Sequence, residues 1–116
     1  MLNQCILTGN LGNDPEVNFY GEGQPIASFN LAFQSGKKKP TGWIKVVSFN
    51  KLAEVVQKYL HSGARVGIIG ILDQKHWETN EGVQRNSFQV IAQGIEFIRT
   101  DGRGFEKGQP EDEIPF

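Results

Sequence analysis

Glycines separate short runs of β-branched and aromatic residues over most of this chain. The 116 residues include 14 glycines, and Gly, Asn, Asp and Pro gather between the apolar runs, as at positions 9–15 and 21–25. Apolar and polar side chains alternate from Ile26 to Gln34, which is the period of a strand, and residues 43–49 are a further run of β-branched and aromatic residues. We therefore expect strands at residues 3–8, 16–20 (continuing the first strand beyond a kink), 26–34, 43–49 and 64–72, then a hairpin with arms 74–79 and 84–93, and a bend at Gly94 before 95–98.

One segment changes to helical spacing. Apolar side chains recur three and four residues apart between Leu52 and Leu60, which predicts an amphipathic helix over residues 51–61, with Asn50 as N-cap and Gly63 as stop signal. Residues 64–72 are apolar on both faces, which predicts burial on both sides. The order strand, strand, strand, helix, strand, strand is typical of the all-β OB fold, a five-stranded Greek-key barrel with its helix between strands 3 and 4.

Charge divides the chain into two parts. The formal net charge is −1, but residues 1–100 have a net charge of +2 and residues 101–116 a net charge of −3. The apolar pattern stops near Thr100, so we expect one OB-fold domain over residues 1–100 and a short, disordered acidic tail over residues 101–116. A mildly basic body and an acidic tail indicate separate partners.

Several classes of protein are excluded by the same sequence. No apolar run approaches the ~18 residues of a membrane span, and the first residues lack the character of a targeting segment. A single cysteine, Cys5, excludes an internal disulfide, and its apolar neighbours indicate a small buried side chain. We expect a soluble, cytoplasmic protein without membrane contact.

Aromatic and basic side chains share one face of the strand at residues 43–49. Trp43, Lys45 and Phe49 fall on that face, and flat rings beside a cation suit single-stranded nucleic acid, whose bases stack while lysines meet phosphates. A second set of aromatic and basic side chains lies in the arms of the predicted hairpin and in the loop before Trp43. The sequence therefore predicts base stacking by Trp43, Phe49 and Trp77, and phosphate contacts by Lys37, Lys38, Lys39, Lys45, Lys51, Lys75 and Arg85.

Each of these residues also has a simpler interpretation. A lone tryptophan at the end of a strand is more often part of a core or its rim, and Phe49 precedes a helix, where core residues are common. The three consecutive lysines alone are typical of a solvated loop. Only their combination favours a nucleic-acid surface.

The last six residues form a second motif. An acidic run is followed by two apolar side chains: Glu111, Asp112, Glu113, Ile114, Pro115 and Phe116. Such a segment can insert Ile and Phe into an apolar pocket while basic residues at the rim hold its carboxylates. The alternative is an unstructured, solubilising tail.

Catalytic chemistry finds little support. The two histidines, His61 and His76, have no neighbouring Ser/Asp pair, carboxylate dyad or metal-ligand spacing. The glycines belong to turns between strands and lack the strand-to-helix setting of a phosphate loop. We expect no enzyme activity, no metal and no cofactor.

With these motifs assembled, the chain resembles the bacterial single-stranded DNA-binding protein (SSB) family. The resemblance lies in the opening strand and glycine-rich turn at residues 5–17, in the strand and helix at residues 43–60, and in the acidic Ile-Pro-Phe tip at residues 111–116. It implies an OB fold, usually a homotetramer, that binds single-stranded DNA without sequence preference and without catalysis in replication, recombination and repair. It also implies that Trp43, Phe49 and Trp77 are stacking residues, that the tip recruits partner proteins, and that the protein is cytoplasmic and associated with the nucleoid.

The chain departs from this family in several places. The loop before Trp43 is shorter, and three lysines stand where a further tryptophan is expected. Positions that are basic in the family hold Gln4, Asn18 and Asp73, and the linker at residues 101–110 is short. These changes predict weaker binding per subunit. They also leave open a rival function, a protein-interaction module like the OB-fold primosomal proteins, which the acidic tip argues against.

Overall fold

The structure is a computed structural model that describes residues 1–99. It is mostly β, with one helix between the fourth and fifth strands. In chain order the elements are β1 (Cys5–Leu11), β2 (Glu16–Tyr20), β3 (Gln24–Gln34), β4 (Thr41–Phe49), α1 (Asn50–Tyr59), β5 (Arg65–Glu78) and β6 (Gln84–Arg99). The architecture is compatible with the predicted OB fold. The expected acidic tail lies outside the described residues.

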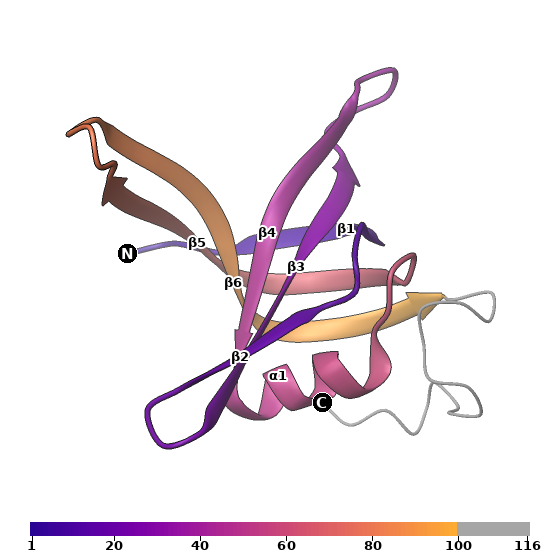
Figure 1. Cartoon of the computed structure of the whole chain (residues 1–116). Helices are drawn as coiled ribbons and strands as arrows, with labels where there is room; N and C mark the ends of the chain where they lie inside the picture. The colour runs from indigo at the N-terminus through magenta and orange to yellow at the C-terminus, as the bar shows by residue number, and fades with distance from the viewer. Residues whose placement is uncertain (100–116) are drawn as a thin grey trace.

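The strands form one curved sheet, in the order β1-β5-β6-β4-β3-β2 (Figure 1). An additional pairing joins β1 to β3 at Leu11 and Leu31. Strand β2 also pairs with β3, where Glu16 lies opposite Ser28. The interrupted first strand expected from the sequence is therefore confirmed. All pairings are antiparallel except the short parallel contact between β4 and β6, where Lys45 lies opposite Gln89.

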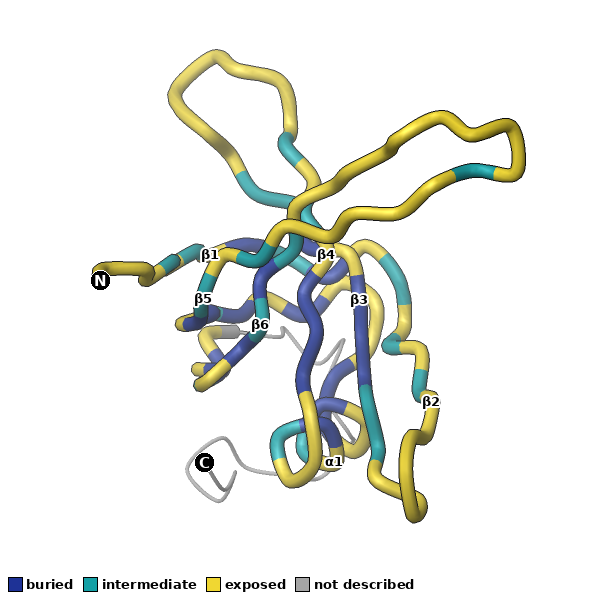
Figure 2. Tube along the Cα trace, turned by 90° about the vertical axis from the view of Figure 1, so that its left-hand side faces the viewer, coloured by how far each residue is buried: buried dark blue, intermediate teal, exposed yellow. Residues whose placement is uncertain are grey.

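Two hairpins extend from the body as arms, one formed by β3 and β4 and the other by β5 and β6 (Figure 1). Both arms are largely exposed along their length (Figure 2). The predicted division of β5 at residue 73 and of β6 at Gly94 is wrong, because each strand runs through without interruption. Gly94 pairs with Ile69 and Ala92 with Gly70, so Gln93 is an extra residue that absorbs the bend as a bulge.

The helix α1 ends two residues earlier than expected. Asn50 begins α1 with φ 56°, and no side chain caps the helix. The prediction of an Asn50 cap is wrong, because its Oδ1 accepts a hydrogen bond of 2.9 Å from the Tyr20 hydroxyl instead. The helix ends at Tyr59, and Gly63 adopts φ 93° in the following turn, a conformation that glycine favours.

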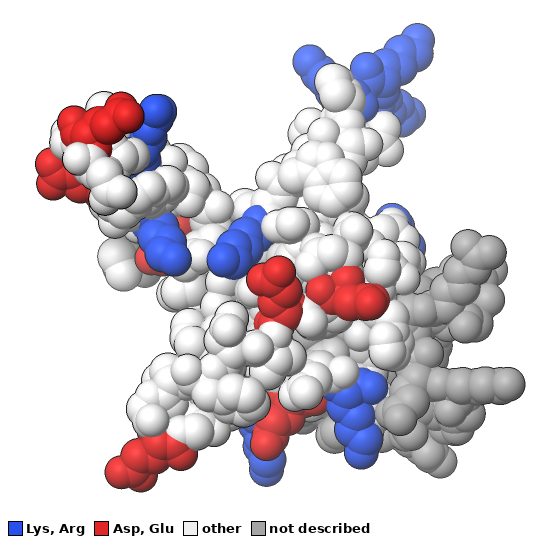
Figure 3. Space-filling view, in the orientation of Figure 1, with Lys and Arg blue, Asp and Glu red and all other residues white. Residues whose placement is uncertain are grey.

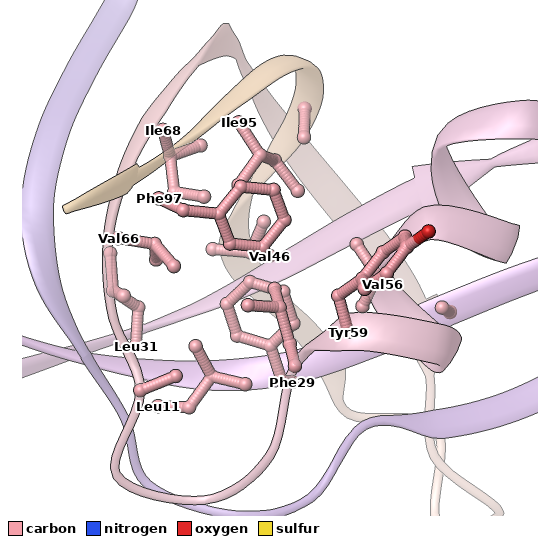
Figure 4. Packing of buried hydrophobic residues seen from close by; sticks show 14 of the residues in the cluster. Leu11, Phe29, Leu31, Val46, Val56, Tyr59, Val66, Ile68, Ile95 and Phe97 are labelled. Carbon is pink, nitrogen blue, oxygen red and sulfur yellow. The ribbon is translucent and has the colours of Figure 1, made fainter. Parts of the chain in front are cut away.

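The core lies between the inner face of the sheet and α1. Phe29, Leu31 and Val46 from the sheet are buried against Val56 and Tyr59 from the helix (Figure 4). Cys5, which was expected to be buried, is only half-buried, where it packs against this core. The expectation that residues 64–72 are buried on both sides is wrong on the outer face, where Ile69 is 40% exposed, because no other part of the described chain covers it. No helix in residues 1–99 is long and apolar enough to cross a membrane.

Candidate nucleic-acid interface

Strand β4 presents its aromatic and basic side chains outward. Val46 and Ser48 point into the core and are fully buried, so the alternate positions, Trp43, Lys45 and Phe49, lie on the outer face. Trp43 is 61% exposed and Phe49 37% exposed. The alternative that these two rings belong to the core does not hold in this structure.

Strand pairing extends this face across β6 and β5. Lys45 lies opposite Gln89, and Gln89 lies opposite Asp73. Further along the arm Lys75 lies opposite Ser87 and Trp77 lies opposite Arg85. Residues that are paired directly across a sheet share a face, so Trp43, Lys45, Phe49, Lys75, Trp77 and Arg85 all belong to one continuous surface, which we call the outer aromatic face.

A cleft crosses the outer aromatic face where the β5–β6 arm meets β4. It has a volume of about 400 Å³ and is lined by Lys45, Lys75, Trp77, Ser87, Phe88 and Gln89. Two lysines and an indole ring thus converge from two strands that are far apart in the sequence. Phe88, which is 53% exposed, was not singled out from the sequence; its only signal there was its place in the second hairpin arm.

The remaining predicted basic residues lie elsewhere. Lys37, Lys38 and Lys39 are exposed at the tip of the β3–β4 arm, where Lys and Arg side chains gather in Figure 3. Lys39 also lines a separate hollow of about 680 Å³ with Arg65. Lys51 lines a groove of about 470 Å³ beside α1, with Leu52 and Lys58 among its neighbours. The structure therefore does not bring Lys51 to the cleft.

Gly12 supports the indole of Trp43. A Cβ atom at Gly12 would lie 2.4 Å from Cζ3 and 2.9 Å from Cη2 of Trp43, so the ring rests against the bare backbone of this glycine. The Gly12 N–H donates a 2.8 Å hydrogen bond to the carbonyl of Asn30, which holds that backbone on β3. The sequence marked Gly12 only as part of a turn; its contact with Trp43 was missed.

Tyr20 orients Phe49. The two rings meet edge to face, with centroids 6.1 Å apart and an interplanar angle of 86°. The Tyr20 hydroxyl is bonded to Asn50, the residue that follows Phe49. Since Phe49 is 37% exposed, this contact holds in place a ring that is partly open to solvent. Tyr20 carried no sequence signal beyond its aromatic ring.

Two carboxylates also belong to the outer aromatic face. Asp73 accepts a 3.0 Å hydrogen bond from Nε2 of Gln89, and Glu16 lines a smaller hollow of about 180 Å³ with Lys45 and Asn30. They offset part of the positive charge of Lys45, Lys75 and Arg85. The net positive charge of this face is therefore low, as the sequence indicated for residues 1–100 as a whole.

His61 and His76 are exposed, and within residues 1–99 no group of three or more His, Cys, Asp and Glu side chains is placed to hold a metal ion. The acidic tip, Glu111–Phe116, lies outside the described residues.

Two comparisons with known proteins agree with this geometry. Residues 2–98 match the model of the single-strand binding protein family. The chain is also similar to a single-stranded DNA-binding protein of Rhizobium meliloti (strain 1021), with 38% identity over 118 aligned residues that cover 92% of this chain and 68% of that protein. The matched range includes every strand that builds the outer aromatic face, and the chain therefore belongs to the single-strand binding protein family.

Proposed function

We propose that this protein binds single-stranded DNA, without sequence preference and without catalysis, on the outer aromatic face of a five-stranded Greek-key OB barrel. The observation that supports this most directly is the single surface shared by Trp43, Phe49 and Trp77. Three exposed rings from two strands, with Lys45 and Lys75 between them, match the alternation of bases and phosphates along a single strand. The bases of a duplex are already paired and stacked on one another, so they are not available to stack on these rings.

Stacking contributes more to this binding than charge does. Each stacked base is worth about 1–3 kcal/mol, and three rings are available. The basic residues Lys45, Lys75 and Arg85 share the face with Asp73 and Glu16, so few phosphates are neutralised. We therefore expect a shallow salt dependence, with a log–log slope of roughly −0.7 for each phosphate neutralised on a single strand.

Intrinsic tryptophan fluorescence tests this function directly. Trp43 and Trp77 are the two tryptophans of the chain, and both belong to the proposed surface, so quenching reports on this surface alone. Oligo-dT is expected to quench the emission and duplex DNA of equal length to leave it nearly unchanged. Equal quenching by both, or none by either, would contradict the proposal. An affinity for oligo-dT no better than millimolar would favour the protein-interaction module instead.

Self-association is part of the proposal. Ile6 and Ile69 lie opposite each other on β1 and β5 and are 67% and 40% exposed. Ile98, 42% exposed, extends the same patch beside Gly67. Neighbouring isoleucines on the outer side of a sheet are typical of an interface, and we propose that this patch, which we call the isoleucine patch, contributes to a homotetramer. Sedimentation of the free protein measures the assembly.

We further propose that residues Glu111–Phe116 recruit replication, recombination and repair proteins in the cytoplasm, where the protein is associated with the nucleoid. Acidic residues followed by Ile-Pro-Phe suit an apolar pocket with a basic rim. Because these residues are separate from the outer aromatic face in sequence, their loss is expected to remove recruitment and to leave DNA binding intact.

A further inference from the structure

A hollow that contains two cations lies beyond Trp43, outside the cleft. It has a volume of about 680 Å³ and lies between β1, the β3–β4 arm and the start of β5. Two exposed basic residues line it, Lys39 from the arm and Arg65 from β5, and we call it the Arg65 hollow. None of the described residues that line it is acidic, whereas the outer aromatic face contains Asp73 and Glu16. On charge alone, the Arg65 hollow therefore suits an anion better than the cleft does.

Strand pairing connects the Arg65 hollow to Trp43. Trp43 lies opposite Ala32 on β3. Ala32 in turn lies opposite Asn10 on β1, and Asn10 lies opposite Arg65 on β5. Residues that are paired directly across a sheet share a face, so Arg65 lies on the same outer side as Trp43, three strand spacings or roughly 14 Å along the sheet. A single strand that stacks on Trp43 can continue directly to Arg65.

The Arg65 guanidinium is held by a neutral partner. Its Nη1 donates a 2.9 Å hydrogen bond to Oδ1 of Asn10, and Nδ2 of Asn10 donates a 3.2 Å hydrogen bond to the Gly63 carbonyl. These two bonds fix the orientation of the amide. Within residues 1–99 no carboxylate is bonded to Arg65, so the amide positions the guanidinium without neutralising its charge. The planar fork of N–H donors on a guanidinium matches the oxygens of a phosphate.

We propose that Arg65 and Lys39 bind a phosphate of single-stranded DNA beyond Trp43, a contact that rests on the proposed function and extends it to a longer segment of DNA. Arg65 is the contacting residue, Asn10 positions its guanidinium, and Lys39 supplies a second positive charge. The contact reads no base, so binding remains independent of sequence. A strand that covers only the three rings of the outer aromatic face does not reach the Arg65 hollow, whereas a longer strand does.

The test measures binding of oligo-dT of increasing length to the full-length protein, by anisotropy at several salt concentrations. For the longest oligonucleotide, Arg65→Gln is expected to weaken binding about two- to fivefold and to reduce the log–log salt slope by about 0.7, which corresponds to one phosphate. Lys39→Gln, at an exposed residue of the loop, is a second variant with the same expected pattern. With the shortest oligonucleotide that binds the wild type, both variants are expected to keep wild-type affinity. Lys58→Gln is the matched control at every length, because it removes an exposed cation from the groove beside α1.

The dependence on length separates this contact from the outer aromatic face. An equal loss in Arg65→Gln at every length, or an unchanged salt slope with the longest oligonucleotide, would overturn the inference and leave the proposed function standing. A rise in affinity would show that Arg65 holds an anionic segment of the protein instead, and a changed sedimentation coefficient would place Arg65 in the interface of the isoleucine patch. Either result would also overturn the inference. Failure of the wild type to bind oligo-dT of any length would overturn both, and urea denaturation confirms that each variant is folded.

Discussion

Gly12→Ala is the change that most directly tests how the structure positions Trp43. The added Cβ would lie 2.4 Å from the ring, which is too short for a van der Waals contact, so an atom must move. The backbone of Gly12 is hydrogen-bonded to Asn30, whereas the indole is 61% exposed. We therefore expect the ring to move away and to lose the orientation in which a base stacks on it.

The expected cost follows from the worth of one stacked base. A base–aromatic contact contributes about 1–3 kcal/mol, and displacement of the ring forfeits a large part of it. We expect Gly12→Ala to weaken oligo-dT binding by about 1–2 kcal/mol, which is roughly 5- to 30-fold in the dissociation constant. The free energy of unfolding is expected to change by less than about 1 kcal/mol, because the displaced ring is at the surface.

A double-mutant cycle makes the reasoning refutable. Anisotropy of labelled oligo-dT gives the dissociation constants of Gly12→Ala, Trp43→Ala and the double variant. If the glycine acts through the ring, Gly12→Ala costs nothing further once Trp43 is alanine. Gly36→Ala is the matched control, because a Cβ there meets only the Lys39 side chain, at 3.5 Å. The role of the Gly12–Trp43 contact would be refuted if Gly12→Ala lowered the affinity equally in the wild type and in Trp43→Ala. It would also be refuted if Gly12→Ala bound oligo-dT with wild-type affinity.

Four further predictions follow from other parts of the molecule. Phe29→Ala, at a ring that is 2% exposed, is expected to lower the free energy of unfolding by about 3–5 kcal/mol in urea denaturation; a loss below 1 kcal/mol would contradict its place in the core. Tyr20→Phe removes the hydrogen bond to Asn50 and is expected to cost about 0.5–1.5 kcal/mol of stability. The dissociation constant for oligo-dT is expected to stay within about twofold, since the ring contact with Phe49 remains. A larger loss of affinity would indicate that the hydroxyl itself contacts DNA. Ile6→Asp is expected to lower the sedimentation coefficient by placing a charge in the isoleucine patch, and an unchanged coefficient would remove that patch from the interface. Deletion of Ile114–Phe116 is expected to abolish recruitment of partner proteins and to leave oligo-dT affinity equal or slightly higher; a tenfold fall in affinity would show that the tip is not a separate recruitment motif.

Much of the candidate site was accessible from the sequence because strand geometry is local. The two-residue period of a strand predicts that Trp43 and Phe49 share a face with Lys45, and the structure confirms it. The helix was predicted to within two residues at its end for the same reason, since its apolar spacing is a local pattern. The resemblance to the single-stranded DNA-binding family, which rested on three short stretches, is confirmed over residues 2–98.

What the sequence determined by itself was therefore the kind of surface: rings alternating with lysines on a strand, within a β-rich domain that has one helix. Only the tertiary structure decided which residues complete that surface. The cleft exists because β4 and β6 pair in parallel at Lys45 and Gln89, positions 44 residues apart in the chain, and Gly12 reaches Trp43 across β3. The periodicity of a strand depends on its neighbours along the chain, whereas the register between distant strands depends on the packing of the whole sheet. A sequence pattern therefore shows the periodicity of a strand directly, but it does not show the register between distant strands.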